Sequence, residues 1–419
     1  MCIKGWSPVG TFTWEFFCIR YSNYMRKIGK YSLIACAILA ISVFTSCTKT
    51  KVEVVNSPSV QAAPKNKPVV KVFLENSGSM DGFMCDGSQL KDGIYNYLTN
   101  VKDNASKMEL YYINSETKKQ DVPLSDYIRN LNPSAFQKAG GNRAFTDIPN
   151  LFKRVLSSVD ENTIAVYISD CILDIPNHAA PDFLHITQTD MHNVFGDKIA
   201  KQKNLAVCIY QLESTFSGTY FFPKGGSQKY NGKLPYYMFV IGSNSQLANL
   251  RKKVSESQIT HGVKNYCAFS PSYDAPTTLL QGNKPAKSLE LNTQRDGRFK
   301  FKVQSDLSLS LQNDNILTAD SNYTMSNPND LVIESISPIT SEGSDYSHII
   351  EFSIVDKVFG SVVTINRISM PNWIKQSNDN GGNSVAPSKT FGIEFILGGI
   401  SDAYLDEKTA SFKLNIKKQ

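Results

Sequence analysis

Oxygen-bearing side chains occur in three separate stretches of the chain, each next to a predicted strand or helix. Glu75-Asn76-Ser77-Gly78-Ser79 follows an apolar run at 69–74. Thr146 precedes a helical pattern, and Asp170 ends a later apolar run. Carboxylate and hydroxyl oxygens are hard donors, which suit Mg²⁺ or Mn²⁺ with water completing the coordination shell. We therefore predict that these stretches form a divalent-cation site.

Alternating strands and helices between residues 69 and 257 would bring these stretches together. Short apolar runs predict buried strands, and apolar residues at helical spacing predict the helices between them. Strands separated by helices pair in parallel, with helices on both faces, and ligands bind at the carboxyl ends of the strands. The predicted strands are 69–74, 108–113, 163–168, 205–210 and 236–241, the predicted helices lie near 90–101, 148–156, 188–201 and 244–256, and 215–234 is a polar insertion.

This pattern resembles the von Willebrand factor A (vWA) domain with its metal-ion-dependent adhesion site (MIDAS). The family motif is Asp-x-Ser-x-Ser, followed by a separate Thr and a separate Asp. Ser77 and Ser79 match the two serines, Thr146 the threonine and Asp170 the last aspartate. The resemblance implies a Rossmann-like α/β domain with a mostly parallel sheet, a bound Mg²⁺ or Mn²⁺, and a protein partner that supplies a carboxylate to the ion.

The chain departs from the family motif at its first position, where Glu75 replaces Asp. The extra methylene allows two outcomes: the carboxylate reaches the ion by displacing a water, or it crowds the pocket and leaves a loop scaffold without metal. Mg²⁺ tolerates geometric error poorly, because its ligands lie at about 2.0–2.1 Å. Turn and helix-cap roles for Ser77, Ser79 and Thr146 are compatible with either outcome.

Four cysteines lie beyond Cys47, and two of them follow loops of the predicted site. Cys85 lies after the Ser77–Ser79 turn, and Cys171 follows Asp170 directly. An oxidising compartment permits disulfides, so a Cys85–Cys171 bridge is one pairing open to the chain.

Sequence features of catalysis and nucleotide binding are missing. Neither Ser77 nor Ser79 lies in the Gly-x-Ser-x-Gly elbow of a nucleophilic serine, and the chain has no Walker A or Gly-x-Gly-x-x-Gly loop. We therefore expect no enzymatic activity and no catalytic residues. The alternatives to cation-dependent recognition are a metal-independent scaffold or assembly lipoprotein and, with less support, an envelope hydrolase.

The N-terminus predicts export and lipid anchoring. Arg26, Lys27 and Lys30 precede an apolar segment at 32–44, which ends in Phe-Thr-Ser-Cys at Cys47. This order resembles the lipobox of bacterial lipoproteins, so we expect residues 1–46 to be an upstream extension and signal peptide. Cys47 would then be acylated and held in a lipid bilayer, with 47–68 as a flexible linker. We expect a place in the cell envelope, on the periplasmic side of the outer membrane.

The C-terminal third predicts a second domain of a different class. Apolar residues alternate with polar ones, and turn residues separate the runs, which indicates an antiparallel, Ig-like β-sandwich at 285–419 after a connector at 258–284. Predicted strands lie at 298–303, 307–311, 331–336, 348–355, 361–368, 391–397 and 412–416, and 372–389 is a polar loop.

Charge and hydropathy exclude two classes of protein. The 419 residues carry a formal charge of +6, of which residues 1–46 contribute +4 (Lys4, Arg20, Arg26, Lys27 and Lys30 against Glu15). The remaining +2 gives no electrostatic basis for nucleic-acid binding. Only the N-terminal apolar segment approaches the length of a membrane span, so a multi-span membrane protein is also excluded.

Overall fold

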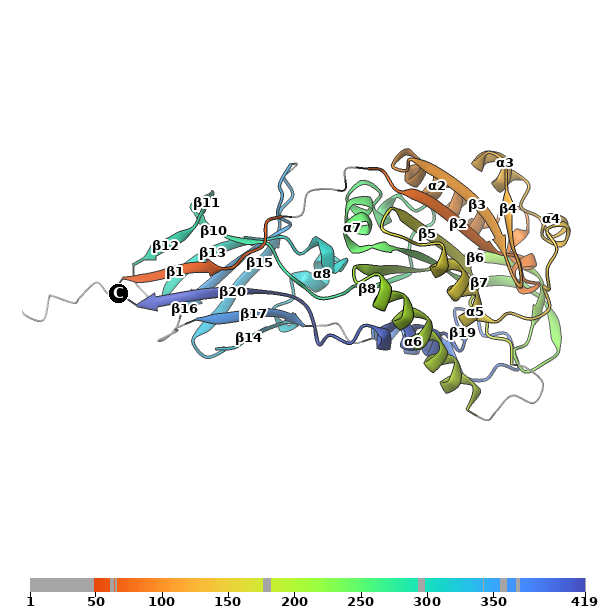
Figure 1. Cartoon of the computed structure of the whole chain (residues 1–419). Helices are drawn as coiled ribbons and strands as arrows, with labels where there is room; N and C mark the ends of the chain where they lie inside the picture. Colours follow the sequence, from red (N-terminus) through yellow and green to blue (C-terminus); the bar gives the residue numbers. More distant parts are fainter. Residues whose placement is uncertain are drawn as a thin grey trace, which may run out of the picture. The chain divides into compact units, whose positions relative to one another are not determined.

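A computed structural model describes residues 49–60, 64, 66–175, 182–292, 298–341, 343–354, 360–366 and 370–418 (Figure 1). The predicted leader and Cys47 lie outside the described residues. From Thr50 onward the chain forms one compact unit with mixed α/β architecture. Within the described residues, no helix has both the length and the apolar character required to cross a bilayer.

One sheet carries the predicted site and has seven strands in the order β4-β3-β2-β5-β7-β6-β8. The central strand β2 pairs in parallel with β3 on one side and β5 on the other. Its apolar residues alternate between the two faces, as a strand buried on both sides requires. The strands are β2 Val69–Glu75, β3 Lys107–Ile113, β4 Thr117–Gln120, β5 Thr163–Ser169, β6 Leu205–Phe221, β7 Ser227–Ser243 and β8 Asn265–Phe269.

The prediction of a mostly parallel sheet is wrong, because the sheet is mixed. β6 and β7 form an antiparallel hairpin of 17 residues on each side, and β7 lies between β5 and β6. The segment 215–234, predicted as an insertion, continues both strands of this hairpin. A short turn can join only antiparallel strands, since a parallel pair needs a crossover of a dozen or more residues.

Helices cover both faces of this sheet, as predicted. One core joins Val70, Val72 and Leu74 of β2 with apolar residues of α2 and α7. The other joins Phe73 with apolar residues of α5 and α6. The helices of this part are η1 Ser79–Met84, α2 Gln89–Asp103, α3 Leu124–Arg129, α4 Pro133–Lys138, α5 Ile148–Ser157, α6 Phe183–Lys201, α7 Asn244–Lys253 and η2 Glu256–Gln258.

Two further sheets share a third core, to which Val52, Val303, Ile350 and Leu414 contribute. Their orders are β12-β1-β20-β17-β14, with β9 paired to β20, and β11-β10-β13-β16-β15. Five of the seven strands predicted for the C-terminal third lie in these two sheets. Its elements are β1 Thr50–Val55, β9 Tyr273–Asp274, β10 Thr277–Gln281, β11 Lys284–Ala286, β12 Ser288–Leu291, β13 Phe299–Ser305, η3 Ser308–Ser310, α8 Asp314–Leu317, η4 Asp320–Asn322, β14 Tyr323–Met325, β15 Leu331–Pro338, β16 His348–Ile354, β17 Ser361–Asn366 and β20 Lys408–Lys418.

The predicted flexible linker contains a strand. β1 (Thr50–Val55) pairs with both β12 and β20, so it is an interior strand of its sheet. Val52 is fully buried in the third core. The short alternation in Thr-Lys-Val-Glu-Val-Val was enough for a strand because partners that are distant in sequence flank it on both sides.

The chain returns to the α/β part near its C-terminus, so the predicted boundary at 285–419 is wrong. The segment comprises α9 Asn372–Gln376, β18 Asn378–Asp379, β19 Thr390–Phe391 and α10 Ile393–Ala403. Ile393, Ile396 and Ile400 of α10 join the α5–α6 core, because their spacing is helical. Gly399 permits close contact with α6: an added Cβ would lie 2.3 Å from the Gln188 carbonyl oxygen. The strand predicted at 391–397 is wrong because α10 begins at Ile393, and the strand predicted at 307–311 is wrong because η3 occupies Ser308–Ser310.

Candidate functional site

Glu75 is the central buried acid of the predicted site. It is the last residue of β2 and is fully buried. Its Oε1 accepts a hydrogen bond from Thr146 Oγ1 at 3.2 Å. Its Oε2 accepts hydrogen bonds from Tyr167 Oη at 3.1 Å and from the Ser169 hydroxyl. Burial raises the pKa of Glu75, and these hydroxyl donors only partly offset the rise.

Ser77 and Ser79 form the second component. Their hydroxyl oxygens lie 2.9 Å apart, so both face the same space. Arg143 holds the backbone of this loop: its Nε donates to the Asn76 carbonyl at 2.7 Å and its Nη2 to the Ser77 carbonyl at 3.1 Å. In return, the Gly78 N–H donates to the Arg143 carbonyl at 2.9 Å.

Arg143 also pairs with Asp81 in η1, which fixes the guanidinium between the two segments. Burial raises the pKa of Asp81, while the charge of Arg143 acts in the opposite direction. The Arg143 guanidinium lies over the Phe136 ring, 5.9 Å from its centroid. The position of the two serines therefore depends on an arginine that arrives from the distant 140–147 segment.

Asp170 is the third component and the least satisfied one. It follows β5 and is 1% exposed. Oδ1 accepts a 3.3 Å hydrogen bond from the Ile172 N–H, but Oδ2 has no hydrogen-bond partner among the described residues. Burial raises the pKa of Asp170 to about 8; the charge of Glu75 adds to the rise, and the Ser79 hydroxyl opposes it.

Asp174 adds a further carboxylate that the sequence did not predict. Its Oδ2 accepts the Thr146 N–H at 2.8 Å and so orients the Thr146 loop. Burial raises its pKa, and its charge in turn contributes to the raised pKa of Asp170.

The structure therefore brings the five predicted metal ligands together: Glu75 contacts Thr146, Ser77 contacts Ser79, and Asp170 interacts electrostatically with Glu75 and Ser79. The donor set consists of hard oxygens, and a buried carboxylate oxygen without a partner is the atom that a cation would satisfy. The residues present thus fit Mg²⁺ or Mn²⁺. No cluster of three or more His, Cys, Asp or Glu side chains in metal-binding geometry occurs in the described part of the chain, so the site depends on its hydroxyl oxygens.

The β6–β7 hairpin covers much of this region. Phe216 of β6 packs against Gly82 of η1 so closely that an added Cβ at Gly82 would lie 2.2 Å from its ring. Nearer the hairpin tip, Phe221 lies 3.6 Å from the Cβ position of Gly78, and the Pro223 carbonyl accepts the Ile175 N–H at 3.2 Å. Ser77 is consequently only 3% exposed, whereas Ser79 is partly exposed.

The Cys85–Cys171 disulfide is not formed in the structure, where both residues are free thiols. Cys171 is buried in the α5–α6 core. Cys85 ends η1 near the hairpin, with its Sγ 3.8 Å from the Thr215 carbonyl oxygen. The two side chains therefore pack in different surroundings, although both follow loops of the site.

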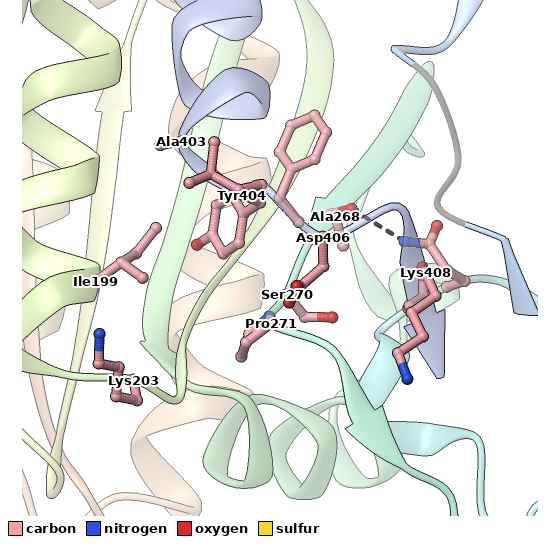
Figure 2. Close-up of a pocket in the computed structure, with 13 residues that line it drawn as sticks. Ile199, Lys203, Ala268, Ser270, Pro271, Ala403, Tyr404, Asp406 and Lys408 are labelled. Atoms are coloured by element: carbon pink, nitrogen blue, oxygen red, sulfur yellow. Dashed lines mark hydrogen bonds between the residues drawn. The ribbon is translucent and has the colours of Figure 1, made fainter. Parts of the chain in front are cut away.

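A pocket of about 200 Å³ opens beside the site and is lined in part by Glu75 and Thr146. A separate pocket of about 230 Å³ lies around Tyr404 (Figure 2). Ile199 near the end of α6, Lys203 just beyond it and the Ala268–Pro271 segment contribute to its lining. None of the predicted site residues lines this second pocket.

Sequence reasoning missed Tyr167, Ser169 and Arg143. Strand pairing could have revealed the first two: β2 and β5 pair with Leu74 beside Ile168, which places the residues at the end of β5 next to Glu75. Tyr167 and Ser169 then point to the same face, since side chains two residues apart share a face of a strand. Nothing local in the sequence indicates the role of Arg143.

No model of a known protein family matches the chain, and no curated protein matches it significantly. Functional inference therefore depends on the site and the fold.

Proposed function

We propose that this chain is an exported, lipid-anchored protein whose α/β part is a vWA-like domain. It binds a protein partner through one divalent cation held by Glu75, Ser77, Ser79, Thr146 and Asp170. The observation that carries the proposal is the buried Oδ2 of Asp170, which has no partner among the described residues although hydroxyl and carboxylate oxygens surround it.

The fold supports the vWA assignment in part. The parallel β3-β2-β5 core and the helices on both faces are features that the family resemblance implies, whereas the antiparallel edge strand β4 is not. The antiparallel β7 between β5 and β6 departs from a mostly parallel sheet. The two-sheet part is proposed as an Ig-like sandwich that acts as a spacer or a second contact surface.

The proposed mechanism is recognition without covalent chemistry. Asp170 and Glu75 supply negative charge, the serine and threonine hydroxyls supply neutral oxygens, and Arg143 keeps the serine loop in place. Mg²⁺ or Mn²⁺, when bound, supplies Lewis acidity for a carboxylate of the partner. Three of the five donors are uncharged hydroxyls, which reduce the ion's Lewis acidity less than carboxylates would and so favour an acidic incoming group.

A metal-independent scaffold is the second candidate, and one observation favours it. The Glu75 carboxylate already accepts three side-chain hydrogen bonds, from Thr146, Tyr167 and Ser169. Burial raises the pKa of Glu75 and Asp170, so a shared proton can replace a cation as the source of compensating charge. In that case the same surface would bind its partner through polar and apolar contacts alone.

Lipid anchoring at Cys47 and a place in the cell envelope, on the periplasmic side of the outer membrane, remain part of the proposal. They derive from the leader sequence, which lies outside the described residues. Cys47→Ala should release the protein from membranes and abolish incorporation of labelled fatty acid; unchanged labelling would remove the anchor from the account.

The functional test is a pull-down from envelope extracts with the purified chain in Mg²⁺ or in EDTA. Ser79→Ala removes one hydroxyl of the site. Ser257→Ala is a matched control, because its hydroxyl also lies close to that of a serine two residues away, at 2.7 Å from Ser255 Oγ.

The proposal predicts a specific partner that is captured in Mg²⁺ by the wild type and by Ser257→Ala. EDTA and Ser79→Ala should each abolish this capture. Partner capture that is indifferent to both EDTA and Ser79→Ala would favour the scaffold function instead.

A further inference from the structure

The pocket beside Glu75 has a lining that the cation-dependent function does not use. It lies between the ends of β2 and β3 and the first turns of α5, and it holds about 200 Å³. That volume is close to the size of one pyranose ring with its substituents. Glu75 and Thr146 line it together with the amide and hydroxyl side chains of Asn114, Ser115, Asn142 and Asn150, the charged Asp147 and Arg154, and the apolar Phe145 and Leu151.

Several of these polar groups are not engaged by any residue that the structure describes. The Asn150 side-chain amide has no such partner, and Asn142 uses its Oδ1 to accept the Ala144 N–H at 2.9 Å, which leaves its Nδ2 free. Arg154 uses only Nη1, which donates to the Asn114 and Ser115 carbonyls. These planar groups offer paired donors and acceptors, the arrangement that adjacent hydroxyls of a ligand require.

Phe145 supplies an aromatic surface at the same pocket. Its side chain is 39% exposed, which is unusual for a large apolar residue in the described chain. An exposed aromatic ring beside polar groups provides contact area with little loss of conformational freedom. The C–H face of a sugar ring is a suitable partner, because the faces of aromatic rings carry partial negative charge.

The charges of the lining nearly cancel. Arg154 and Asp147 have opposite charges, and Glu75, the remaining ionisable group of the lining, is fully buried. A strongly charged ligand would therefore meet one unfavourable group. A large apolar ligand would leave the amides without partners.

We propose that this pocket binds one neutral saccharide unit, with Asn142, Asn150 and Arg154 bonded to its hydroxyls and Phe145 against its ring. This function goes beyond the proposed cation-dependent recognition and does not depend on it. The choice of probes distinguishes binding of a free sugar from binding of one unit of a glycan polymer.

The test is saturation-transfer-difference NMR on the chain from Thr48 onward, in EDTA so that the outcome does not depend on the cation site. The probes are glucose, galactose, N-acetylglucosamine and the trimer of N-acetylglucosamine, with glutarate as an acidic competitor. Phe145→Ala and Asn150→Ala remove two exposed side chains of the lining. Tyr95→Ala and Asn100→Ala are matched controls on α2, where Tyr95 is 41% exposed.

We expect saturable binding of at least one monosaccharide, with a dissociation constant on the order of 1–10 mM for so small a pocket. Phe145→Ala and Asn150→Ala should each weaken it about 5- to 10-fold, as the loss of one aromatic contact or hydrogen bond implies. A markedly tighter trimer would identify a polymer as the source. No binding of any sugar by a folded wild type, or binding of glutarate alone, would overturn the proposal, as would equal affinity in all four variants.

Discussion

Replacing Asp170 with Asn removes a carboxyl group while preserving its shape. Burial and the Glu75 charge raise the pKa of Asp170 from its ordinary value of 3.8 to about 8. In the cation-free protein at neutral pH, folding therefore requires Asp170 to take up a proton that the unfolded chain has lost, which costs free energy. Asn carries no charge in either the folded or the unfolded state, so we expect Asp170→Asn to stabilise the cation-free fold.

The magnitude follows from the pKa difference and has a defined sign. Between pH 3.8 and about 8 the folded protein keeps a proton that the unfolded chain has lost, so wild-type stability falls as pH rises, by about 1.4 kcal/mol per unit. At pH 7 the difference between wild type and Asp170→Asn is on the order of 4 kcal/mol. It should shrink toward zero near pH 4 and level off above about pH 8.

Urea unfolding of both proteins in EDTA, from pH 5 to pH 8, measures this difference. At pH 7 the midpoint of Asp170→Asn should lie higher by roughly 1 M. Mg²⁺ at 100 times its dissociation constant should narrow the difference to roughly 1 kcal/mol, because it stabilises a protein that binds it by about 2.7 kcal/mol, and the Asn variant lacks the charged ligand. A less stable Asp170→Asn protein in EDTA at pH 7, or a stability difference that does not change with pH, would refute the reasoning.

Three other outcomes follow from the packing of the site. Gly82→Ala should lower the free energy of unfolding by about 1–3 kcal/mol, because its Cβ would overlap the Phe216 ring. Gly196→Ala is the control: its Cβ has no neighbour within 4 Å, so it should be neutral or slightly stabilising in the same urea assay. Arg143→Lys should weaken Mn²⁺ binding about 10-fold, because the compact ammonium lacks the planar guanidinium that contacts the Asn76 and Ser77 carbonyls and Asp81 at once. Unchanged affinity would show that Arg143 does not position the site. Of the four described cysteines, Cys85 alone is partly exposed, so mass spectrometry of the native protein after brief treatment with a thiol reagent should find label at Cys85 only; failure to label it without prior reduction would indicate a disulfide.

Local pattern predicted most elements of the seven-stranded sheet. Apolar runs located β2, β3 and β5, and helical spacing located α2 and α5, because these elements bury residues on faces set by their own period. The position of β7 was not predictable in this way. Its apolar run fits either direction of pairing, and the hairpin that fixes the direction consists of residues that look like a polar insertion.

Long-range partners explain the errors in the second part. β1 is an interior strand only because β12 and β20 flank it. Likewise the first half of α10 fell in a predicted strand at 391–397, since its apolar residues are frequent enough to fit either period, and its helical form depends on packing against α6. Neither partner is close in sequence.

The site was predictable to the level of its oxygen donors. Glu75, Ser77, Ser79, Thr146 and Asp170 each lie at the end of a strand or the start of a helix, where sequence can locate them. The hydrogen bonds that satisfy Glu75, the orientation set by Arg143 and the cover provided by the hairpin depend on contacts across 60 or more residues.

The proposed cation can be counted directly. Electron paramagnetic resonance measures free Mn²⁺ during titration of the chain from Thr48 onward, with Ser79→Ala and Ser257→Ala alongside. Loss of the free-ion signal up to one equivalent in the wild type and in Ser257→Ala, but not in Ser79→Ala, is the predicted result. A free Mn²⁺ signal that matches buffer throughout, with folded wild-type protein, would contradict the account.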